Sequence, residues 1–324
     1  MSRFAGSVLA ALVLATHCGL AAAQEWPARP VRIVVAFAPG GLADVVARLF
    51  AQHLEAKTGK SVTVENRSGA GGILGTQAAA QSAPDGYTLL LTTSAPHGSG
   101  PALYKTLPYD PVADFTHISL LGKAPIFLMV KSGEGPQDLA AFVKEGRAAA
   151  APLRYGSPGA GSLGHLTGAL IGLTTGVPME HVPYRGSVPA QVDLLGGRIN
   201  VVSDNLPAHI GQVRAGAIRL LAVSTPERVA AVPAIPTFTE LGFPAISAAA
   251  WFALAAPAGV PERVLAQLHR HAADFVTQPA ISAKLQELGL VPEASASPAA
   301  YRAFVQAEIA RWKDVARKAG IPQE

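Results

Sequence analysis

The sequence of residues 31–50, VRIVVAFAPGGLADVVARLF, carries the signals that decide the fold. Its first part, residues 31–37, is apolar at every position except Arg32, a pattern typical of a β-strand buried on both faces of a sheet. A Pro-Gly-Gly turn ends this run, and apolar residues at a helical period follow it. A strand, a glycine turn and a helix together present free backbone amides at a helix N-terminus, where proteins bind anions. The acid in the first turn of this helix, Asp44, therefore needs its own explanation.

The overall composition predicts a folded protein with a large apolar core. The chain has 324 residues, of which 49% are hydrophobic and only 15% are charged, and this balance argues against disorder. Its length is sufficient for one large domain or two of medium size. The formal net charge is +4 and aromatic residues make up 6%, but no stripe of basic and aromatic residues is present. We therefore do not expect nucleic-acid binding.

Residues 1–23 are predicted to be a signal peptide. A positively charged start is followed by the apolar residues 8–14 and by alanines at 21–23, which is the order of a signal segment and its cleavage site. The apolar stretch is too short to span a membrane, and an uncleaved anchor is the alternative. The only cysteine of the chain, Cys18, lies in this segment. We therefore expect an exported protein without a disulfide, a thiol nucleophile or a Cys-ligated metal.

Beyond residue 24 the sequence alternates strand-like and helix-like runs in two units. Strands are expected at 31–37, 61–66 and 87–93 in the first unit, and at 153–156, 181–184, 199–203 and 218–223 in the second. Helical periods separate these strands, for example at 73–82 and 189–195. This alternation predicts an α/β fold with two mostly parallel sheets, each flanked by helices.

Three further segments suggest how the two units are joined. Apolar strands at 126–130 and 251–255 flank the second unit and are expected to cross between two lobes. Residues 261–320 have a helical pattern and are expected to pack against the first lobe. The resulting division places residues 24–125 and 226–324 in lobe 1 and residues 126–225 in lobe 2.

Loops rich in glycine and small hydroxyl side chains follow several of the predicted strands. Because ligands of open parallel sheets bind beyond the carboxyl ends of the strands, these loops are expected to converge on one site. Their backbone amides and hydroxyl groups suit an oxygen-rich anion such as a carboxylate. The loops are residues 37–41, 92–94, 157–162, 184–186 and 204–205.

Each candidate residue in these loops also has a purely structural interpretation. The glycines after the first strand supply a tight turn in any case, and Ser157 and Ser162 can cap the following helix. Arg185 can be solvated, and Asp204 can pair with a backbone amide or with Arg185. His165, which lies beside an apolar helical residue, can be a core histidine.

The sequence contains no strong enzyme signature. Gly159–Gly164 matches the pattern G-x-G-x-x-G, but Tyr184 and Arg185 occupy the place where a dinucleotide-binding protein carries an acid. Ser162 lacks the first glycine of a nucleophile elbow because that position is Ala160. No HExxH motif, paired histidine spacing or phosphate loop occurs. We therefore expect no metal, no cofactor and no catalysis, and the open alternative is a secreted hydrolase whose site is assembled only in space.

A series of short blocks, in order along the chain, resembles the Bug-type (TctC-like) receptors of the tripartite tricarboxylate transporter system. The resemblance covers about the whole chain after the predicted signal peptide. The blocks include Trp26-Pro, Pro39-Gly-Gly, Asp44-Val-Val-Ala-Arg48, Val64-Glu-Asn-Arg67, Gly69-Ala-Gly-Gly72, Pro84-Asp-Gly-Tyr-Thr-Leu89, Leu103-Tyr, Leu107-Pro-Tyr-Asp-Pro111, His181-Val-Pro-Tyr-Arg-Gly186, Asp204-Asn-Leu-Pro207 and Ala255-Ala-Pro-Ala-Gly259.

This resemblance implies a two-lobed periplasmic binding protein of the type II kind, whose α/β lobes are joined by crossing strands and close on a carboxylated solute. The implied partners are a small organic acid or acidic amino acid and the membrane subunits of a transporter, and we expect a monomer in the periplasm. A receptor that feeds a sensor kinase is an alternative that the sequence leaves open.

The resemblance also marks particular residues as ligand contacts. The family's two ligand-holding loops correspond to Phe37, Ala38, Pro39, Gly40 and Gly41 on one lobe and to Ser157, Ser162, His165 and Asp204 on the other. The remaining candidates lie on the same or neighbouring loops and are Asp44, Thr92, Ser94, His97, Gly161 and Arg185.

Two interpretations of Asp44 follow from its place in the chain. If Gly41 is the N-cap, Asp44 is the third helical residue, where its carboxylate can satisfy the N-cap amide and the helix dipole. Alternatively, Asp44 reaches the cleft and meets an amino group or a protonated acid of the ligand.

Overall fold

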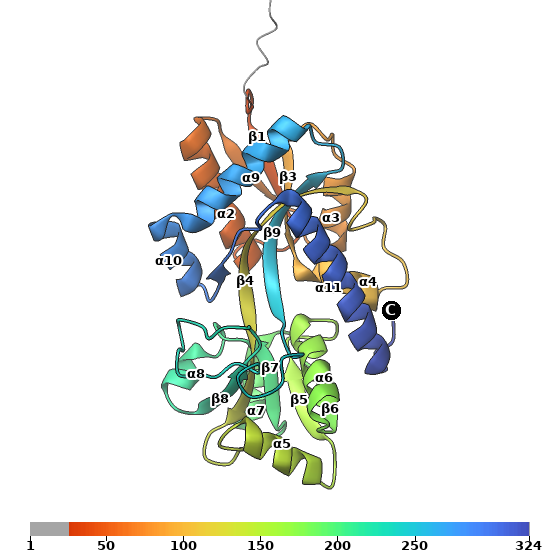
Figure 1. Cartoon of the computed structure of the whole chain (residues 1–324), viewed down its shortest axis with the longest axis vertical. Helices are drawn as coiled ribbons and strands as arrows, with labels where there is room; N and C mark the ends of the chain where they lie inside the picture. The colour runs from red at the N-terminus through yellow and green to blue at the C-terminus, as the bar shows by residue number, and fades with distance from the viewer. Residues whose placement is uncertain (1–25, 324) are drawn as a thin grey trace, which may run out of the picture.

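The computed structural model describes residues 26–323, so the predicted signal peptide, residues 1–23 with Cys18, lies outside the described residues. Two lobes lie one above the other along the long axis of the molecule, and two long strands join them (Figure 1). No helix of residues 26–323 is both long enough and apolar enough to cross a membrane. The predicted α/β fold with two lobes is confirmed.

The sheet of the first lobe consists of three parallel strands, and further antiparallel strands are added at one edge. Its order is β2-β1-β3-β9-β4, with β10 beside β4. The strand bounds are β1 Val31–Val35, β2 Val62–Asn66, β3 Thr88–Thr93, β4 Phe115–Lys131, β9 Ala249–Pro257 and β10 Val291–Pro292. β1 pairs in parallel with β2 and β3, whereas β3 pairs antiparallel with β9.

Helices cover both faces of this first sheet. Ile33 and Val35 share a core with α2 and α9, while the intervening Val34 packs with α3 on the other face. Both faces of β1 are therefore buried, apart from the partly exposed Arg32, as its largely apolar sequence predicts. The helices and helical turns of this lobe are α2 (Leu42–Thr58), η1 (Ala70–Gly72), α3 (Ile73–Ala80), the π-turn η2 (Ala95–Ser99), α4 (Gly100–Leu103), α9 (Glu262–Thr277), α10 (Pro279–Glu287) and α11 (Pro298–Lys318).

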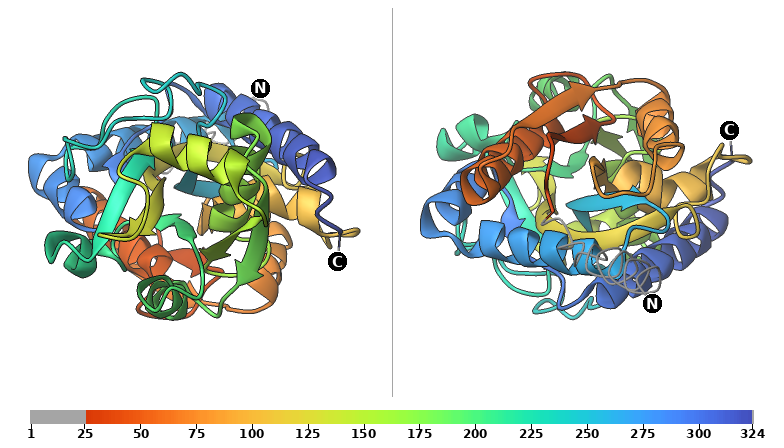
Figure 2. Two further views of the ribbon diagram at one scale, coloured as in Figure 1. Left: turned by 90° about the horizontal axis from the view of Figure 1, so that it is seen from below. Right: turned by 90° about the horizontal axis from the view of Figure 1, so that it is seen from above.

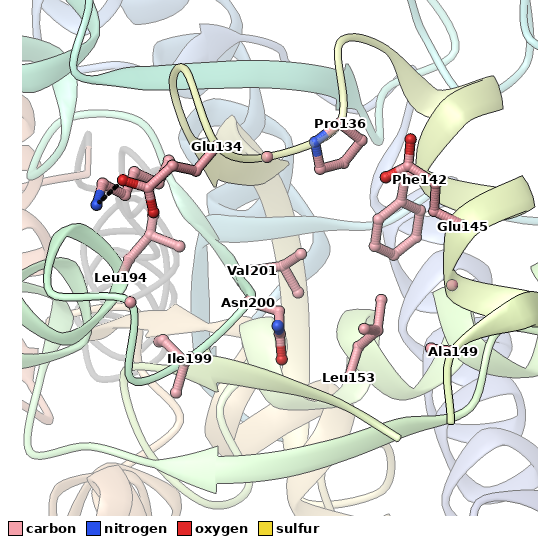
Figure 3. A pocket seen from close by; sticks show the side chains of 14 residues that line it. Glu134, Pro136, Phe142, Glu145, Ala149, Leu153, Leu194, Ile199, Asn200 and Val201 are labelled. Atoms are coloured by element: carbon pink, nitrogen blue, oxygen red, sulfur yellow. Dashed lines mark hydrogen bonds and ion pairs between the residues drawn. The ribbon is translucent and has the colours of Figure 1, made fainter. Parts of the chain in front are cut away.

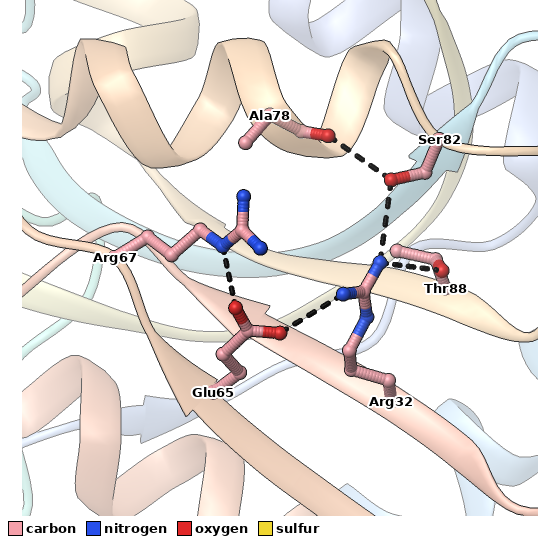
Figure 4. A network of polar contacts seen from close by, with 6 residues as sticks. All are labelled: Arg32, Glu65, Arg67, Ala78, Ser82 and Thr88. Carbon is pink, nitrogen blue, oxygen red and sulfur yellow. Dashed lines mark hydrogen bonds and ion pairs between the residues drawn. The ribbon is translucent and has the colours of Figure 1, made fainter.

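A polar network links the three parallel strands beneath α3 (Figure 4). Arg32 of β1 donates from Nη1 to Glu65 Oε2 of β2 at 3.0 Å and from Nη2 to Thr88 Oγ1 of β3 at 3.3 Å. Arg67 Nε donates to the other carboxylate oxygen of Glu65 at 2.5 Å. Because these charges are partly exposed, they add little to stability, but together they satisfy one another in a single register of the three strands.

The second lobe repeats the plan of the first. β5 (Leu153–Ser157), β6 (Met179–Pro183) and β7 (Val201–Asn205) are parallel in the order β7-β5-β6, and β4 pairs antiparallel with β7. β8 (Ile218–Val223) also pairs antiparallel with β4. The helices are α5 (Leu139–Ala148), α6 (Leu163–Thr175), α7 (Ser187–Leu195) and α8 (Ile210–Arg214). α6 therefore holds the place in this lobe that α2 holds in the first.

Three parts of the prediction were incomplete. β4 begins at Phe115 and not near residue 126, and α5 was not predicted. The C-terminal segment is helical as expected, but β10 interrupts it.

The segment between β8 and β9 packs differently from the predicted division, which placed residues 226–248 in lobe 1. Phe238 and Ile246 are fully buried in the core of the second lobe, and Thr237 forms a bridge with Val223. The reason is that the apolar side chains of β4 and β8 need a cover, and this loop supplies it. We propose that lobe 2 extends to residue 248 and that the second crossing starts with β9.

A buried carboxylate fixes the C-terminal helix α11 to the crossing strand β9. Glu308 Oε2 accepts from the indole Nε1 of Trp312 at 3.0 Å and from that of Trp251 on β9 at 3.3 Å. α11 packs against η2, α4 and β4, as expected for lobe 1, but it also contacts α6 of lobe 2. The helix therefore runs alongside the junction of the lobes (Figures 1 and 2).

Replacing Glu308 with Ala should lower the free energy of unfolding by about 1–3 kcal/mol, because two buried indole N–H groups lose their acceptor. Glu308→Gln should cost less, since the amide oxygen can still accept. Chemical denaturation measures both, with the exposed Asp314→Ala on the same helix as the control, which should change stability by less than about 0.5 kcal/mol. Equal effects of Glu308→Ala and Asp314→Ala would contradict this account.

Candidate ligand-binding cleft

A cavity of about 480 Å³ lies between the two lobes, within the size range of small-molecule sites. We call it the interlobe cavity. The first lobe contributes Phe37, Gly71, Ile73, Ala95, Pro96, Ser99, Gly100, Leu103 and Tyr104; the second contributes residues 158–162 and His165; and the C-terminal tail contributes Ile321 and Pro322. The loops after β1 and β5 therefore meet here, as predicted.

The loop after β5 is shaped by glycines and capped by a serine. Gly161 has a φ of +73°, a left-handed conformation that favours glycine. Ser162 is the N-cap of α6, and its Oγ accepts from the amide of His165 at 3.2 Å and donates to Gly159 O at 2.7 Å. The predicted capping role of Ser162 is thus confirmed, and the same residue also lines the cavity.

Close packing of α6 on its sheet brings this helix N-terminus to the cavity. A Cβ atom at Gly164 would overlap the carbonyl oxygen of Ser203 on β7, and one at Gly168 would overlap the ring of Tyr155 on β5. The glycine pattern that resembles a dinucleotide motif therefore has a packing explanation.

His165 is a neutral side chain in the wall of the interlobe cavity. The amide of Gly161 donates to His165 Nδ1 at 3.1 Å, so the ring proton is assigned to Nε2. The ring stacks on His181 with a centroid distance of 3.7 Å and an interplanar angle of 11°. Burial lowers the pKa of His165 to about 4, and burial together with the neighbouring His165 lowers the pKa of His181 to about 3. Both rings are therefore neutral at pH 7.

Ser157 lies behind the loop and not on the cavity wall. It is fully buried, and its Oγ is 2.7 Å from His181 Nε2 and donates to Gly159 O at 3.0 Å. Its role in the structure is to hold the loop against β6 through His181.

On the first lobe, Phe37 lines the cavity, and residues 38–41 are exposed beside it. Gly40 adopts a left-handed φ of +81°, and Gly41 is the N-cap of α2, as predicted. The first amides of α2, which have no carbonyl partner within the helix, begin at this exposed loop.

Asp44 is buried and its carboxylate is bound on all sides by the first lobe. Oδ2 accepts from the amide of Gly40 at 2.9 Å and from Arg48 Nε at 2.9 Å, and Oδ1 accepts from Asn66 Nδ2 at 2.9 Å. Burial alone would raise the pKa of Asp44, but these three hydrogen bonds outweigh it and hold the pKa below its usual value. The geometry favours the helix-terminus interpretation, with one correction: the bound amide belongs to Gly40, not to the N-cap residue.

The structure does not bring Thr92, Ser94 and His97 to the cavity. Thr92 Oγ1 lies 2.7 Å from His97 Nδ1, and both side chains are fully buried in the first lobe. The His97 ring packs edge-on against Phe115 with a centroid distance of 4.5 Å. Ser94 is also buried. The cause is the π-turn η2, which directs His97 inward and presents Ala95, Pro96 and Ser99 to the cavity instead.

Asp204 and Arg185 also lie away from the cavity lining. Asp204 is buried, with Oδ2 at 2.9 Å from His209 Nε2 and Oδ1 accepting the amide of Asn205 at 2.7 Å. Asp204 therefore has a structural role, as one of its two interpretations predicted. It pairs with a backbone amide, as expected, and with His209 in place of Arg185. Arg185 is exposed and forms no hydrogen bond or ion pair within residues 26–323.

Sequence reasoning missed the apolar part of the cavity wall. Ile73 begins α3, Leu103 ends α4 and Tyr104 follows it. Of these, only Leu103-Tyr104 carried a signal for the site, as one of the family blocks. Ile321 and Pro322 lie far along the chain from every other lining residue, and no local pattern indicates their position.

Another cavity of about 380 Å³ lies at the far end of the second lobe (Figure 3). Phe142, Leu153 and Ile199 give it an apolar wall, and Asn200 Oδ1 in it accepts the amide of Arg154 at 2.8 Å. It contains none of the predicted site residues. Among residues 26–323 no group of three or more His, Cys, Asp or Glu side chains could hold a metal ion.

Replacing Asp44 with Asn should lower the free energy of unfolding at pH 7 by about 1–3 kcal/mol, because an amide cannot accept all three hydrogen bonds. Since the folded-state pKa is depressed, the contribution of Asp44 is present above pH 4 and is lost as the pH falls through the folded pKa. Denaturation at several pH values should therefore show the two proteins converging in acid, with the exposed Asp314→Asn as control. A large change in affinity for amine-free acids would instead place Asp44 against the ligand.

Replacing Thr92 with Val and His97 with Phe together should leave ligand affinity unchanged, because neither side chain reaches the cavity. Burial, with a smaller contribution from His117, lowers the pKa of His97 to about 3. The unfolded chain takes up a proton near pH 6.5 that the folded chain refuses, so His97 makes the protein lose stability as the pH falls from about 6.5 towards 3. The double variant should show a shallower loss between pH 7 and pH 5, by up to about 1.4 kcal/mol per pH unit. A tenfold loss of affinity would refute the placement.

Comparison with known proteins identifies the family of this chain. The family model described as "Tripartite tricarboxylate transporter family receptor" matches residues 46–321. BugT of Bordetella pertussis is 38% identical over 299 residues, which cover 92% of this chain and 91% of BugT.

Two solved structures are also similar over most of the chain. Rpa4515 of R. palustris, solved with adipate, has a TM-score of 0.78 and 37% identity, covering 93% of this chain and 100% of that one. MatC (Rpa3494) of Rhodopseudomonas palustris, with bound malate, has a TM-score of 0.72 and 32% identity, covering 90% of this chain and 99% of that one. With its two α/β lobes, its crossing strands and its interlobe cavity, the chain belongs to the TctC family of tripartite tricarboxylate transporter receptors, the Bug-type periplasmic solute-binding proteins.

Proposed function

We propose that this protein captures a small organic acid between its lobes and delivers it to the membrane subunits of a tripartite transporter. The observation that carries this proposal is the interlobe cavity, onto which each lobe directs a strand-end loop that leads into a helix N-terminus. Such termini offer backbone N–H groups and a positive dipole end, which favour an anionic ligand.

The donors around the cavity are neutral. No Lys or Arg is among the described residues that line it, and its titratable members are His165, which is neutral, and Tyr104. A carboxylate held here would be bound by hydrogen bonds to amides and to His165 Nε2. Closing the lobes would remove water from these bonds and strengthen them. The relatives solved with adipate and malate support a carboxylated ligand.

Export, partners and chemistry complete the proposal. Residues 1–23 have the pattern of a signal peptide, which supports a periplasmic location, and the family description names a transporter receptor. We propose that the protein acts as a monomer. We further propose that it binds and releases its solute without turnover or cofactor, because the groups that line the cavity are suited to hydrogen bonding and include no nucleophile paired with a base.

A thermal-shift screen of small organic acids, followed by calorimetry, tests this function. A true ligand at a hundredfold excess over its Kd should stabilise the protein by about 2.7 kcal/mol. His165→Ala should weaken binding by about tenfold or more, since a hydrogen bond to a charged group is lost. His269→Ala, on α9 and outside the cavity lining, is the matched control and should keep the native affinity.

Two results would count against this function. The first is a broad panel of mono- and dicarboxylates in which no acid stabilises the protein. The second is a bound acid that is converted to product, which would show an enzyme. Delivery to a transporter is tested separately, by recovery of membrane subunits with the acid-loaded protein in a pull-down.

A further inference from the structure

The C-terminal tail is held against the first lobe beyond the end of α11. Gly320 adopts a left-handed φ of +65° and turns the chain, and the amide of Ile321 donates to Ala316 O at 2.9 Å. Gln323 Nε2 then reaches Ala102 O of α4 at 3.4 Å. The last described residues of the chain accordingly lie beside α4 in Figure 1. The tail is thus a fixed part of the structure and occupies one side of the junction between the lobes.

The helix that carries this tail is itself anchored. Trp312 is fully buried, and its indole shares the Glu308 carboxylate with Trp251 of the crossing strand β9. Ile321 packs against the same apolar core as Trp312. The position of Ile321 is therefore set by the strands on which both lobes are built.

Ile321 stands between two cavities. On one side is the interlobe cavity, and on the other is a groove of about 520 Å³ between α6, β6 and the end of α11. Ile321 and His165 line both spaces. The groove beyond them has an apolar wall that includes Leu173, Val177 and Met179. Removing the Ile321 side chain would therefore enlarge the interlobe cavity towards a space that already exists.

The walls of the interlobe cavity differ in polarity. Most of the donors lie on the second lobe, in the loop before α6 and at His165, whereas Phe37, Ile73, Leu103 and Ile321 form an apolar wall. The hydroxyl side chains of the first lobe in this lining are Ser99, which donates to Ser94 O at 3.4 Å, and Tyr104. No Asp or Glu is among the described lining residues, so a ligand ammonium group would have no carboxylate partner there. Burying hydroxyl or ammonium groups against such a wall costs free energy, whereas methylene groups gain by it.

We propose that Ile321 and Pro322 form an end wall that limits the size of the ligand, and that the ligand is an organic acid with an unsubstituted hydrocarbon body. This inference rests on the proposed function, because it names the class of acid and the residues that select it. The wall selects in two ways: by the volume that Ile321 occupies, and by its apolar side chains, which leave the Tyr104 hydroxyl as the main polar group for the body of the ligand on that side.

Calorimetry with the series succinate, glutarate, adipate, pimelate, suberate and 3-methyladipate tests the size limit. Ile321→Ala should raise affinity for the largest acids, relative to adipate, by about tenfold, which corresponds to about two newly buried methylene groups. Ile321→Phe should shift the preference towards the shorter acids. Leu241→Ala, an exposed apolar residue that lines neither cavity, is the control and should keep the native profile. Thermal melts without ligand check that each variant is folded.

A second arm tests the polarity of the wall. Galactarate, a hydroxylated diacid with the carbon chain of adipate, and 2-aminoadipate should each bind the native protein at least about tenfold more weakly than adipate, because their added groups are buried without partners. Equal or tighter binding of either would overturn the hydrocarbon-body assignment.

The outcomes separate this inference from the function beneath it. If the native protein binds no acid at all, the proposed function fails and the inference fails with it. If the native protein binds acids but the preferred size is the same in the native protein, Ile321→Ala and Ile321→Phe, the function stands and the end wall is refuted.

Discussion

The antiparallel pairing of β4 with β9 is the constraint on which the binding cleft depends. β4 pairs with β9 from Phe115 to Pro125 and then continues into the second sheet, where it pairs with β7 and β8. One strand therefore belongs to both sheets, and shifts in its register with β9 let it bend between them. Because both sheets are built on this strand, the loop after β1 and the loop after β5 face one another across the same cavity.

The C-terminal helix α11 is the third element of this junction, beside β4 and β9. The Glu308 carboxylate binds one indole from α11 and one from β9, so the helix follows the crossing strand and not a lobe surface alone. A buried carboxylate that satisfies two N–H donors is costly to disrupt. This explains how a short tail near the end of the chain can be placed reliably enough to form part of a ligand cavity.

The fold and half of the candidate site could be predicted from local sequence. The apolar run at 31–37, the N-cap at Gly41 and the cap at Ser162 are local signals, and each was confirmed. The prediction that His97 contacts the ligand was wrong for a reason that local patterns do not show. The π-turn η2 directs the His97 side chain into the first lobe, where it packs against Phe115. Ile321 could not be predicted, because its neighbours in the cavity are brought to it by the topology of the whole chain.

The acid in the first turn of α2 finally explains why the two lobes are unequal partners for an anion. At the start of α2, the Asp44 carboxylate accepts from the amide of Gly40 and lies beside the positive end of the helix, where it also pairs with Arg48. At the start of α6 the cap is a neutral serine and the first turn contains no acid. The stronger attraction for a carboxylate therefore lies on the second lobe, beside His165. Under the proposed function, a ligand that docks there first would have its body directed towards the apolar side chains of the first lobe and the tail. The electrostatics of the helix ends and the polarity of the wall would then favour the same orientation.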